Sequence, residues 1–565
     1  MFKKNTKHLQ SDLFGFYNTL PKAMQNKVLQ SEEYHFYKII FSNIDESIFS
    51  VLYSEEKSRP NSPINSMVAS LLLMNRRTWT YDELFKNIQF HLLVKIALGL
   101  DQISDVPFCV ATLFNFQNRL HKHFIETGEN LLERVFDQLT EEQLKKLKLK
   151  TDIQRTDSFA ALSNIRNYSR LQLLVEMIIR IYRVLSEEDQ QRFIDQFIAY
   201  INKTSGQYIY SLNSEDIPHE LEKVGQLYVW IDQTLYPRYQ ELQIFQTFQL
   251  VFTEHFTVVD EKIEIKPPDQ LKSDSVQSPD DLDAAYRKKN GKSGKGQSVN
   301  IVETADPSNP IQLLTDVAVN PLNQDDNRVL HKRLGRLKEK TPSLNELHHD
   351  AAYGSAENDL KCEHLGITTI QTAVRGNQSV VPITIEQVSE SNYVVKCPLQ
   401  TVKSQKARKR FKASFDLLIC QQCECQEKCP ALVMKKHRIY YFTHDMYLSK
   451  KRQRIIETLP PERQKLRCNV EATINEFVCK MPKGKLKVRD AFKTAVFAYS
   501  VAMSVNFGRI FRLIQDNPIK YLRFFATFVK IVKEQMGLIF SPLSNSLKRQ
   551  LFCENVQFVN YHVFR

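Results

Sequence analysis

The sequence predicts an α/β protein in which an all-helical N-terminal region precedes a mixed sheet covered by helices. Apolar residues recur at helical spacing in the first 150 residues, whereas residues 297–372 follow the order strand pair, helix, strand, helix, strand. With 565 residues, 42% of them hydrophobic and only 15 Gly, the chain is too long for one core and too apolar to be disordered. Three or four structural units are therefore expected.

The N-terminal region, residues 1–150, is predicted to be helical and to bind DNA. The run from Thr80 to Glu83 is a capping box that begins one helix. Residues 110–124 show an apolar face at helical spacing, and their opposite face carries side chains of the types that contact phosphates and base edges. A merely solvated surface is the alternative interpretation. The candidate DNA-binding residues on this face are Asn115, Asn118, Arg119 and Lys122.

Residues 151–164 are predicted to form the first strand of the sheet, and residues 165–266 a helical insertion. Leu171, Leu174 and Ile178 illustrate the apolar spacing of this insertion, in which no residue pattern suggests chemistry. We therefore expect the insertion to interrupt the sheet in sequence but not in space.

The remainder of the sheet is predicted between residues 267 and 376. Ser355 is the expected N-cap of a helix between the last two strands. His348 and His349, in the third of these strands, are interpreted as residues that pack within the strand or lie on the surface, and a role in tuning a metal site is the alternative. The expected strands are 297–303, 311–319, 344–349 and 367–372, with a helix at 325–340.

Three acidic residues in separate local settings form the strongest candidate site. Asp157 and Asp350 lie at ends of predicted strands, and Glu471 lies on a predicted helix within residues 456–515. Each alone is commonly a solvated surface charge, but three carboxylates brought together can hold two Mg²⁺ or Mn²⁺ ions, and such a site cuts and rejoins phosphodiesters. Arg467, four residues before Glu471, is expected on the same helix face, either pairing with Glu471 or gripping a phosphate.

Positive charge is concentrated in one part of the chain. Residues 403–493 contain 23 Lys and Arg against 9 Asp and Glu, an excess of 14, while the formal net charge of the whole chain is +13. Such a concentration favours a polyanionic partner, because each neutralised phosphate releases counterions. Since the segment contains Glu471, nucleic acid is favoured over a solvated face. Its candidate DNA contacts are Arg408, Lys409 and Arg410.

A cysteine cluster lies in a predicted Cys-rich basic insertion, residues 377–455. Four thiolates at this spacing suit a tetrahedral structural zinc ion, and a reduced Cys-rich loop without metal is the alternative. Cys425 is left over, and His437 is an alternative ligand. The favoured ligands are Cys397, Cys420, Cys423 and Cys429.

The acidic motifs, in their order and spacing, resemble those of the DDE transposases of bacterial insertion sequences, in the group with a helical N-terminal domain and a long interruption after the first Asp. Phe159, Ala352 and Gln464 depart from residues common in these or related families. The stretches that carry the resemblance are Arg59-Pro60, Leu98-Gly99-Leu100-Asp101, 112–120, Asp157-Ser158, Arg170-Leu171, 281–287, 349–355, Arg467 and Glu471.

This resemblance implies a ribonuclease-H-like sheet, interrupted by the helical and the Cys-rich insertions. It implies DNA transposition, with Mg²⁺-dependent cleavage and strand transfer at the terminal inverted repeats of an insertion sequence, and with Asp157, Asp350 and Glu471 as metal ligands. The implied partners are double-stranded DNA, as transposon ends and target, and a second copy of the chain on that DNA. A decayed transposase that only binds DNA and a nuclease of the same fold are the alternatives.

The sequence predicts a soluble intracellular protein. The longest apolar stretch near the end, residues 494–505, is too short to span a bilayer. The first residues lack the apolar core of a signal peptide, and the ten Cys do not form the pattern of a secreted disulfide framework. The resemblance implies a cytoplasmic, nucleoid-associated bacterial protein. The final segment, residues 516–565, is expected to be a helical tail.

Overall fold

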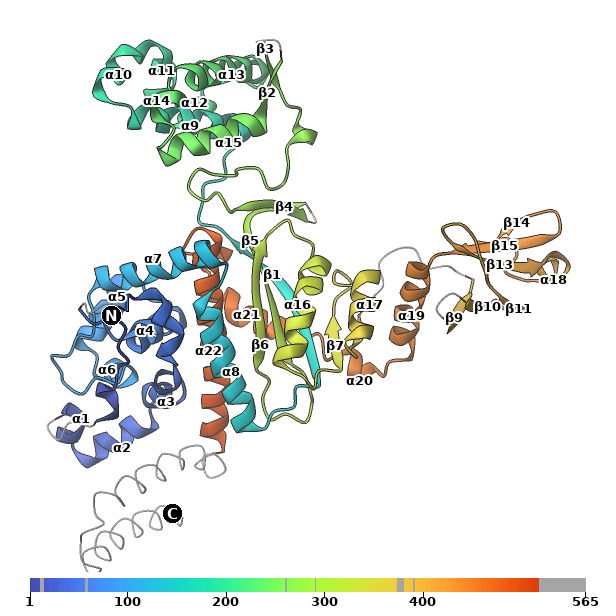
Figure 1. Cartoon of the computed structure of the whole chain (residues 1–565), viewed down its shortest axis with the longest axis horizontal. Coiled ribbons are helices and arrows are strands. Elements are labelled where there is room, and N and C mark those ends of the chain that lie inside the picture. The colour runs from blue at the N-terminus through green and yellow to red at the C-terminus, as the bar shows by residue number, and fades with distance from the viewer. Residues whose placement is uncertain are drawn as a thin grey trace, which may run out of the picture. The chain divides into compact units, whose positions relative to one another are not determined.

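The computed structural model describes residues 1–10, 15–55, 59–259, 262–289, 291–372, 381–389 and 392–517. They form a mixed α/β protein with a helical N-terminal region and a mixed sheet of parallel and antiparallel strands (Figure 1). The expected helical tail lies outside the described residues from 518 onward. In the part of the chain that is described, no helix combines the length and the apolar character needed to cross a membrane.

The N-terminal region packs around α4 (Ile64–Arg77), whose first ten residues are all buried. The predicted capping box is confirmed at the start of α5 (Tyr81–Phe90), where the Thr80 hydroxyl accepts from the Glu83 N–H (3.2 Å) and the Glu83 carboxylate accepts from the Thr80 N–H (2.7 Å). The predicted helix at 110–124 is α7 (Val110–Thr127). The other α-helices of this region are α1 (Phe16–Thr19), α2 (Lys22–Gln30), α3 (Glu32–Ile39), α6 (Leu92–Ala97) and α8 (Leu131–Leu147).

A six-stranded mixed sheet follows, in which β6, β5, β1, β7 and β8 lie side by side in that order and β4 pairs with the first part of β5. β1 is antiparallel to β5 and parallel to β7, and β7 is parallel to β8. The predicted strands are confirmed, with ends shifted by a few residues, as β1 (Ile153–Leu162), β5 (Lys292–Thr304), β6 (Leu314–Pro321), β7 (Glu346–His349) and β8 (Thr368–Gln371). β4 (Ala285–Lys289) was not predicted.

Helices cover both faces of this sheet. α16 (Asp326–Lys340) and α17 (Ala356–His364) share one apolar cluster with Val302 of β5, which is paired with Thr156 (Figure 1). The Ser355 hydroxyl caps α17 as predicted. On the other face, the ring of Phe159 lies 5.3 Å from that of Phe477 in α21 (Val470–Val478). Because side chains alternate along a strand, the odd-numbered residues of β1 point toward α21.

The insertion after β1 is helical as predicted, and it ends in a hairpin that the sequence did not predict. At its centre, buried Tyr228 donates a hydrogen bond to the Leu174 carbonyl (3.0 Å). Its elements are α9 (Arg170–Val184), α10 (Glu187–Arg192), α11 (Ile194–Ile201), α12 (Ser205–Tyr210), α13 (Ile217–Thr234), α14 (Tyr236–Tyr239), α15 (Gln243–His255), β2 (Phe256–Val259) and β3 (Lys262–Ile265).

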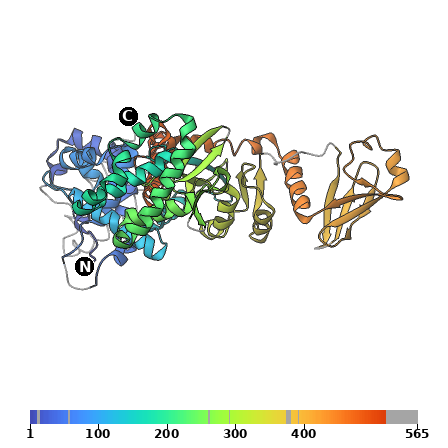
Figure 2. The same ribbon diagram turned by 90° about the horizontal axis from the view of Figure 1, so that it is seen from above.

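The Cys-rich segment forms a three-stranded and a four-stranded sheet around one small apolar core (Figures 1 and 2). Tyr393, Phe415, Tyr440 and Phe442 are the aromatic residues buried in that core. The elements are β9 (Thr384–Ser389), β10 (Asn392–Lys396), β11 (Thr401–Lys403), β12 (Gln405–Lys406), β13 (Phe411–Asp416), α18 (Leu417–Gln421), β14 (Leu432–Val433), β15 (His437–Phe442) and α19 (His444–Thr458).

The helical segment expected at residues 456–515 is broken into pieces. Pro460 and Pro461 separate α19 from the short α20 (Pro461–Gln464), because proline restricts the residue before it and lacks an N–H. Turns then lead into α21, and α22 (Ala491–Asp516) follows after Pro482. Glu471 is therefore the second residue of α21, and Arg467 lies before that helix. The prediction that both share one helix face is wrong.

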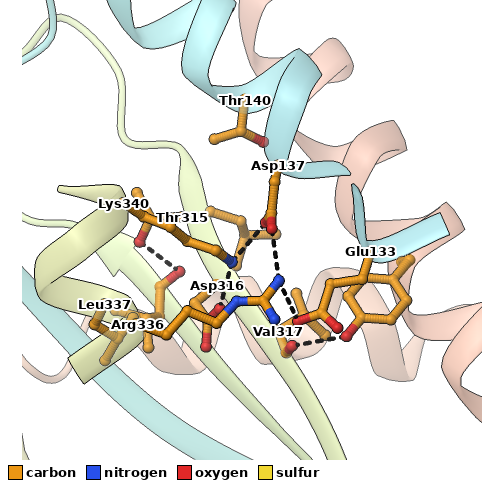
Figure 3. Close-up of polar contacts among 12 residues, drawn as sticks. Glu133, Asp137, Thr140, Thr315, Asp316, Val317, Arg336, Leu337 and Lys340 are labelled. Atoms are coloured by element: carbon orange, nitrogen blue, oxygen red, sulfur yellow. Dashed lines mark hydrogen bonds and ion pairs between the residues drawn. The ribbon is translucent and has the colours of Figure 1, made fainter. Parts of the chain in front are cut away.

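An ion-pair network joins α8 to the sheet (Figure 3). Asp316 of β6 is buried, and the ammonium of Lys340 lies 2.8 Å from it and 2.5 Å from Asp137 of α8. The Arg336 guanidinium lies 2.8 Å from the Glu133 carboxylate and 2.6 Å from that of Asp137. Burial pushes the pKa of Asp316 upward, but Lys340 and the neighbouring Arg333 outweigh it, so the pKa is lowered. The network thus holds α8 on β6 and α16.

Candidate active site

Asp157 and Asp350 lie at the same end of the parallel contact between β1 and β7. The last parallel pair is Arg155 with His348, two residues before each acid. β7 ends at His349, so Asp350 directly follows it as predicted, whereas β1 continues beside β5 with Asp157 opposite Ile301. Asp157 is therefore inside β1 and not at its end, which corrects the sequence prediction. Asp157 and Asp350 therefore lie just beyond the point where β1 and β7 stop pairing.

Asp157 is a buried carboxylate, only 8% exposed. Burial raises its pKa above the ordinary range, and the charges of Asp350 and Asp326 act in the same direction, while the Ser158 N–H (2.8 Å) and the Arg467 guanidinium oppose them. The net upward direction means that the Ser158 N–H and the Arg467 guanidinium do not fully offset the burial of the carboxylate and the two nearby negative charges. A cation at this place would offset the repulsion.

The turn after β7 fixes Asp350. Its Oδ1 accepts a hydrogen bond from the Ala352 N–H (2.7 Å), and its carbonyl accepts one from the Tyr353 N–H (3.3 Å). His348 and His349 are each 1% exposed, so they pack inside the fold and the surface position is wrong. Burial lowers the pKa of His349 to about 4, so its ring is neutral at physiological pH.

Arg467 links the first acid to the third. Its Nη2 donates to Asp157 Oδ2 (2.7 Å), and its Nη1 lies 3.7 Å from Glu471 Oε1. The Glu471 side chain is 68% exposed, whereas that of Arg467 is 17% exposed. The pairing of Arg467 with Glu471, one of the two interpretations from sequence, is present, and the contact with Asp157 is the shorter one.

A buried ion pair anchors the segment that carries Arg467 and Glu471. Arg155 Nε donates to Glu303 Oε1 (2.7 Å), and the two side chains are 6% and 0% exposed. Arg155 Nη1 also donates to the Leu466 carbonyl (2.8 Å), and the Thr473 hydroxyl donates to Glu303 Oε2 (2.8 Å). Sequence reasoning missed this pair. The available signal was a charged residue, two positions before Asp157, within a strand expected to be buried.

Asp326 is a second residue that the sequence did not indicate. It is buried at the first turn of α16, and Asn300 Nδ2 donates both to its Oδ1 (3.3 Å) and to the hydroxyl oxygen of Tyr353 (2.9 Å). An Asp at the start of a helix is a common local feature, so only the folded sheet distinguishes this one. Its charge adds to the negative potential around Asp157.

The carboxylates of Asp157, Asp350 and Glu471 do not form a complete metal-binding site in this structure. Among the described residues, no three His, Cys, Asp or Glu side chains are arranged closely enough to hold a metal ion. Asp157 and Glu471 instead contact the Arg467 guanidinium, and Asp350 acts on Asp157 through its charge. The donor types suit a hard divalent cation, and binding one requires Arg467 to move aside.

The predicted DNA-binding residues of α7 are exposed. The Arg119 guanidinium lies 5.0 Å from the ring of Tyr53, and the Lys122 ammonium lies 3.7 Å from the Glu126 carboxylate. Asn115, Arg119 and Lys122 line a cavity of about 650 Å³, whereas Asn118 is exposed outside it.

The candidate DNA contacts at 408–410, which we call the basic tip, lie in the turn between β12 and β13. The Ala407 N–H donates to the Arg410 carbonyl (2.8 Å), which closes the turn. Arg408, Lys409 and Arg410 are exposed, and the Arg410 guanidinium stacks 3.6 Å from the ring of Tyr441.

Comparison of the chain with models of protein families, with curated proteins and with solved structures found no match.

Proposed function

We propose that this protein is a DDE-type DNA transposase, which cleaves DNA at the ends of an insertion sequence and joins those ends to a target. The observation that carries the proposal is the meeting of three separate chain segments around Asp157. Asp350 adds negative charge there, and Arg467 connects Asp157 to Glu471. Each of these residues belongs to a motif of the transposase resemblance.

The sheet supports the ribonuclease-H-like core that the resemblance implies. An antiparallel meander of β1, β5 and β6 is followed by the parallel strands β7 and β8, with helices between them. The long insertion after β1 and the Cys-rich segment before α21 both interrupt this core in sequence while leaving its strand pairing intact.

The donor set fits the Mg²⁺ ions of such an enzyme. Asp157, Asp350 and Glu471 offer hard carboxylate oxygens. Burial, with a smaller contribution from the charges of Asp350 and Asp326, raises the pKa of Asp157, and a dication would favour its ionised form. When bound, the two ions supply activation of a water or a 3′-hydroxyl and stabilisation of the leaving oxygen of the phosphodiester.

Arg467 has two successive partners in this proposal. Without DNA, its guanidinium neutralises Asp157 and Glu471. Once those carboxylates serve as ligands, the guanidinium turns to a phosphate near the cut, which it can bind through two parallel hydrogen bonds. The buried pair of Arg155 and Glu303 keeps α21 on β1 throughout, because it contacts both Leu466 and Thr473.

DNA is the partner, with two copies of the chain on it. The exposed basic tip at 408–410 and the polar face of α7 supply phosphate contacts, and Asn115 and Asn118 are of the type that reads base edges.

The test is cleavage of a supercoiled plasmid that carries the DNA flanking the gene on both sides. We expect Mg²⁺-dependent nicking or breakage at the outer ends of this DNA, and joined products when target DNA is added. Binding of that DNA without cleavage in Mg²⁺ or Mn²⁺ would instead support a DNA-binding protein, and cleavage without joining would support a nuclease.

A further inference from the structure

Four cysteines line one small cavity in the Cys-rich segment. Cys397, Cys420, Cys423 and Cys429 surround a space of about 20 Å³, which is room for a single ion or water molecule. Val381, Ile383 and Phe415 close the space with apolar surface. All four cysteines are free thiols.

The backbone positions these thiols with local turns. Cys397 follows β10 and its N–H donates to the Gln400 carbonyl (2.9 Å), while Cys420 lies in α18 and its carbonyl accepts from the Cys423 N–H (3.3 Å). Gln400 ties the two parts together, because its Oε1 accepts from the Asp416 N–H (2.8 Å) and its Nε2 lies 3.3 Å from Cys420 Sγ. The two turns therefore face each other with little freedom to separate.

We propose that Cys397, Cys420, Cys423 and Cys429 bind one structural Zn²⁺ ion in a closed tetrahedral site. Thiolate sulfur and four-fold coordination select zinc over Mg²⁺, and four protein ligands leave no open position for catalysis. The inference is independent of the proposed transposase activity, since it concerns a segment outside the sheet that carries Asp157.

The lining of the cavity decides which side chains belong to the site. Cys425 and His437 do not line the cavity, although the spacing of residues allows either as a ligand, and His437 is exposed at the start of β15.

Zinc binding must draw the sulfurs inward. No three of the described Cys, His, Asp or Glu side chains are spaced as metal ligands before an ion is present. Coordination then deprotonates the thiols and couples metal affinity to the order of the segment. Zinc binding therefore orders the basic tip. The 22 residues between Cys397 and Cys420 run through β11, β12, the turn at 408–410 and β13. The ion closes this loop at its base.

The test measures metal and thiol reactivity on the full chain. Purified protein is assayed for zinc by elemental mass spectrometry, and a Co²⁺-substituted sample is examined for thiolate charge transfer and for tetrahedral absorption bands. We expect one equivalent of zinc per chain, lost in each of C397S, C420S, C423S and C429S and retained in the matched controls C425S and C468S. Loss of metal in C425S, or its retention in two of the four variants, would overturn the ligand set.

A second measurement avoids any misfolding of the variants. Wild-type protein is alkylated with iodoacetamide before and after treatment with a chelator, and the labelled cysteines are identified by peptide mass spectrometry. We expect the four proposed ligands to be protected only before chelation, and Cys425 and Cys468 to react in both samples. Equal labelling of all six in a zinc-supplemented sample would rule the site out.

Discussion

Arg467 Nη2 lies 2.7 Å from Asp157 Oδ2, although 310 residues separate the two in sequence. This contact holds the segment that precedes α21 against β1. On the proposed function, this guanidinium also occupies the place where the Asp157 carboxylate would hold a metal ion, so the two cations would compete for the same oxygen atoms.

Replacing any of the three acids should remove cleavage. We expect Asp157→Asn, Asp350→Asn and Glu471→Gln each to lower Mg²⁺-dependent cleavage of the flanking DNA by more than about 100-fold, since loss of a mere supporting partner of a metal ligand already costs up to that much. DNA affinity, measured by fluorescence anisotropy, should change little. Glu462→Gln, an exposed glutamate of the adjacent α20, is the matched control. Near-normal cutting by one of the three variants would remove that residue from the site.

Divalent cations should stabilise the wild-type fold. The raised pKa of Asp157 means that its ionisation opposes folding, and this penalty sets in as the pH rises through the folded pKa. At pH 7 without metal, Asp157→Asn should therefore melt at a higher temperature than wild type. Added Mg²⁺ should raise the melting temperature of wild type and Glu462→Gln but not of Asp157→Asn. An equal response to Mg²⁺ in all three would contradict a site at Asp157.

The buried pair of Arg155 and Glu303 should matter more than a surface pair. Arg155→Met leaves the Glu303 charge buried without its partner, which typically costs about 3 to 5 kcal/mol of unfolding free energy. The double variant Arg155→Met/Glu303→Met should recover much of that loss but not cleavage, because α21 loses its contacts to β1. Lys145→Met, which breaks an exposed pair with Glu141, should change stability by less than about 0.5 kcal/mol. Urea unfolding measures all three, and a double variant less stable than Arg155→Met would count against the buried pair.

Acid should weaken the helical insertion through His255. Burial, and then the charges of Arg170 and Lys266, lower the pKa of His255 to about 4, and Arg170 Nε donates to its Nδ1 (3.1 Å). The pKa of His255 in the unfolded chain is 6.5, so the stabilisation that comes from keeping this imidazole neutral in the fold is complete above pH 6.5. It is lost as the pH falls toward 4, to a limit of about 3 kcal/mol of unfolding free energy. His255→Gln should flatten this part of the pH dependence of urea unfolding.

The exposed His219 of α13 provides the comparison for that experiment. His219→Gln should keep the wild-type slope between pH 6.5 and 4. If His255→Gln kept it as well, the buried imidazole would not be the group that responds to acid.

The basic tip should set part of the salt dependence of DNA binding. Neutralising Arg408, Lys409 and Arg410 with Gln should reduce the slope of log affinity against log salt by up to about 3, because each phosphate contact contributes about 0.9. A control that neutralises Lys145, Lys146 and Lys223, which already pair with glutamates, should leave the slope nearly unchanged. Equal slopes for the two triple variants would remove the tip from the DNA interface.

Local patterns in the sequence predicted much of the sheet. Alternating apolar residues located β5 and β6, and the Ser355 cap located the start of α17, because these signals depend only on neighbouring residues. The break before α21 was missed even though Pro460 and Pro461 precede it, since apolar spacing resumes on both sides. Asp157 was expected at a strand end, but β1 extends past it because β5 offers a longer partner than β7.

The supporting residues of the site were beyond local reasoning. Arg155 and Glu303 are partners across 148 residues, and Asp326 becomes important only when α16 lies against the sheet beside Asp157. Nothing in the spacing of charged residues distinguishes such pairs from surface charges. The four cysteines around the cavity, without Cys425, were identifiable from spacing, but the exclusion of His437 required the folded turns.

The order of the segments along the chain has a consequence for a protein still on the ribosome. Every strand of the six-stranded sheet is synthesised before Arg467 and Glu471, because both follow α19. On the proposed function, a nascent chain that has already assembled this sheet holds only the first two acids and is inert. Nearby chromosomal DNA is therefore protected from premature breakage until translation has passed the start of α21.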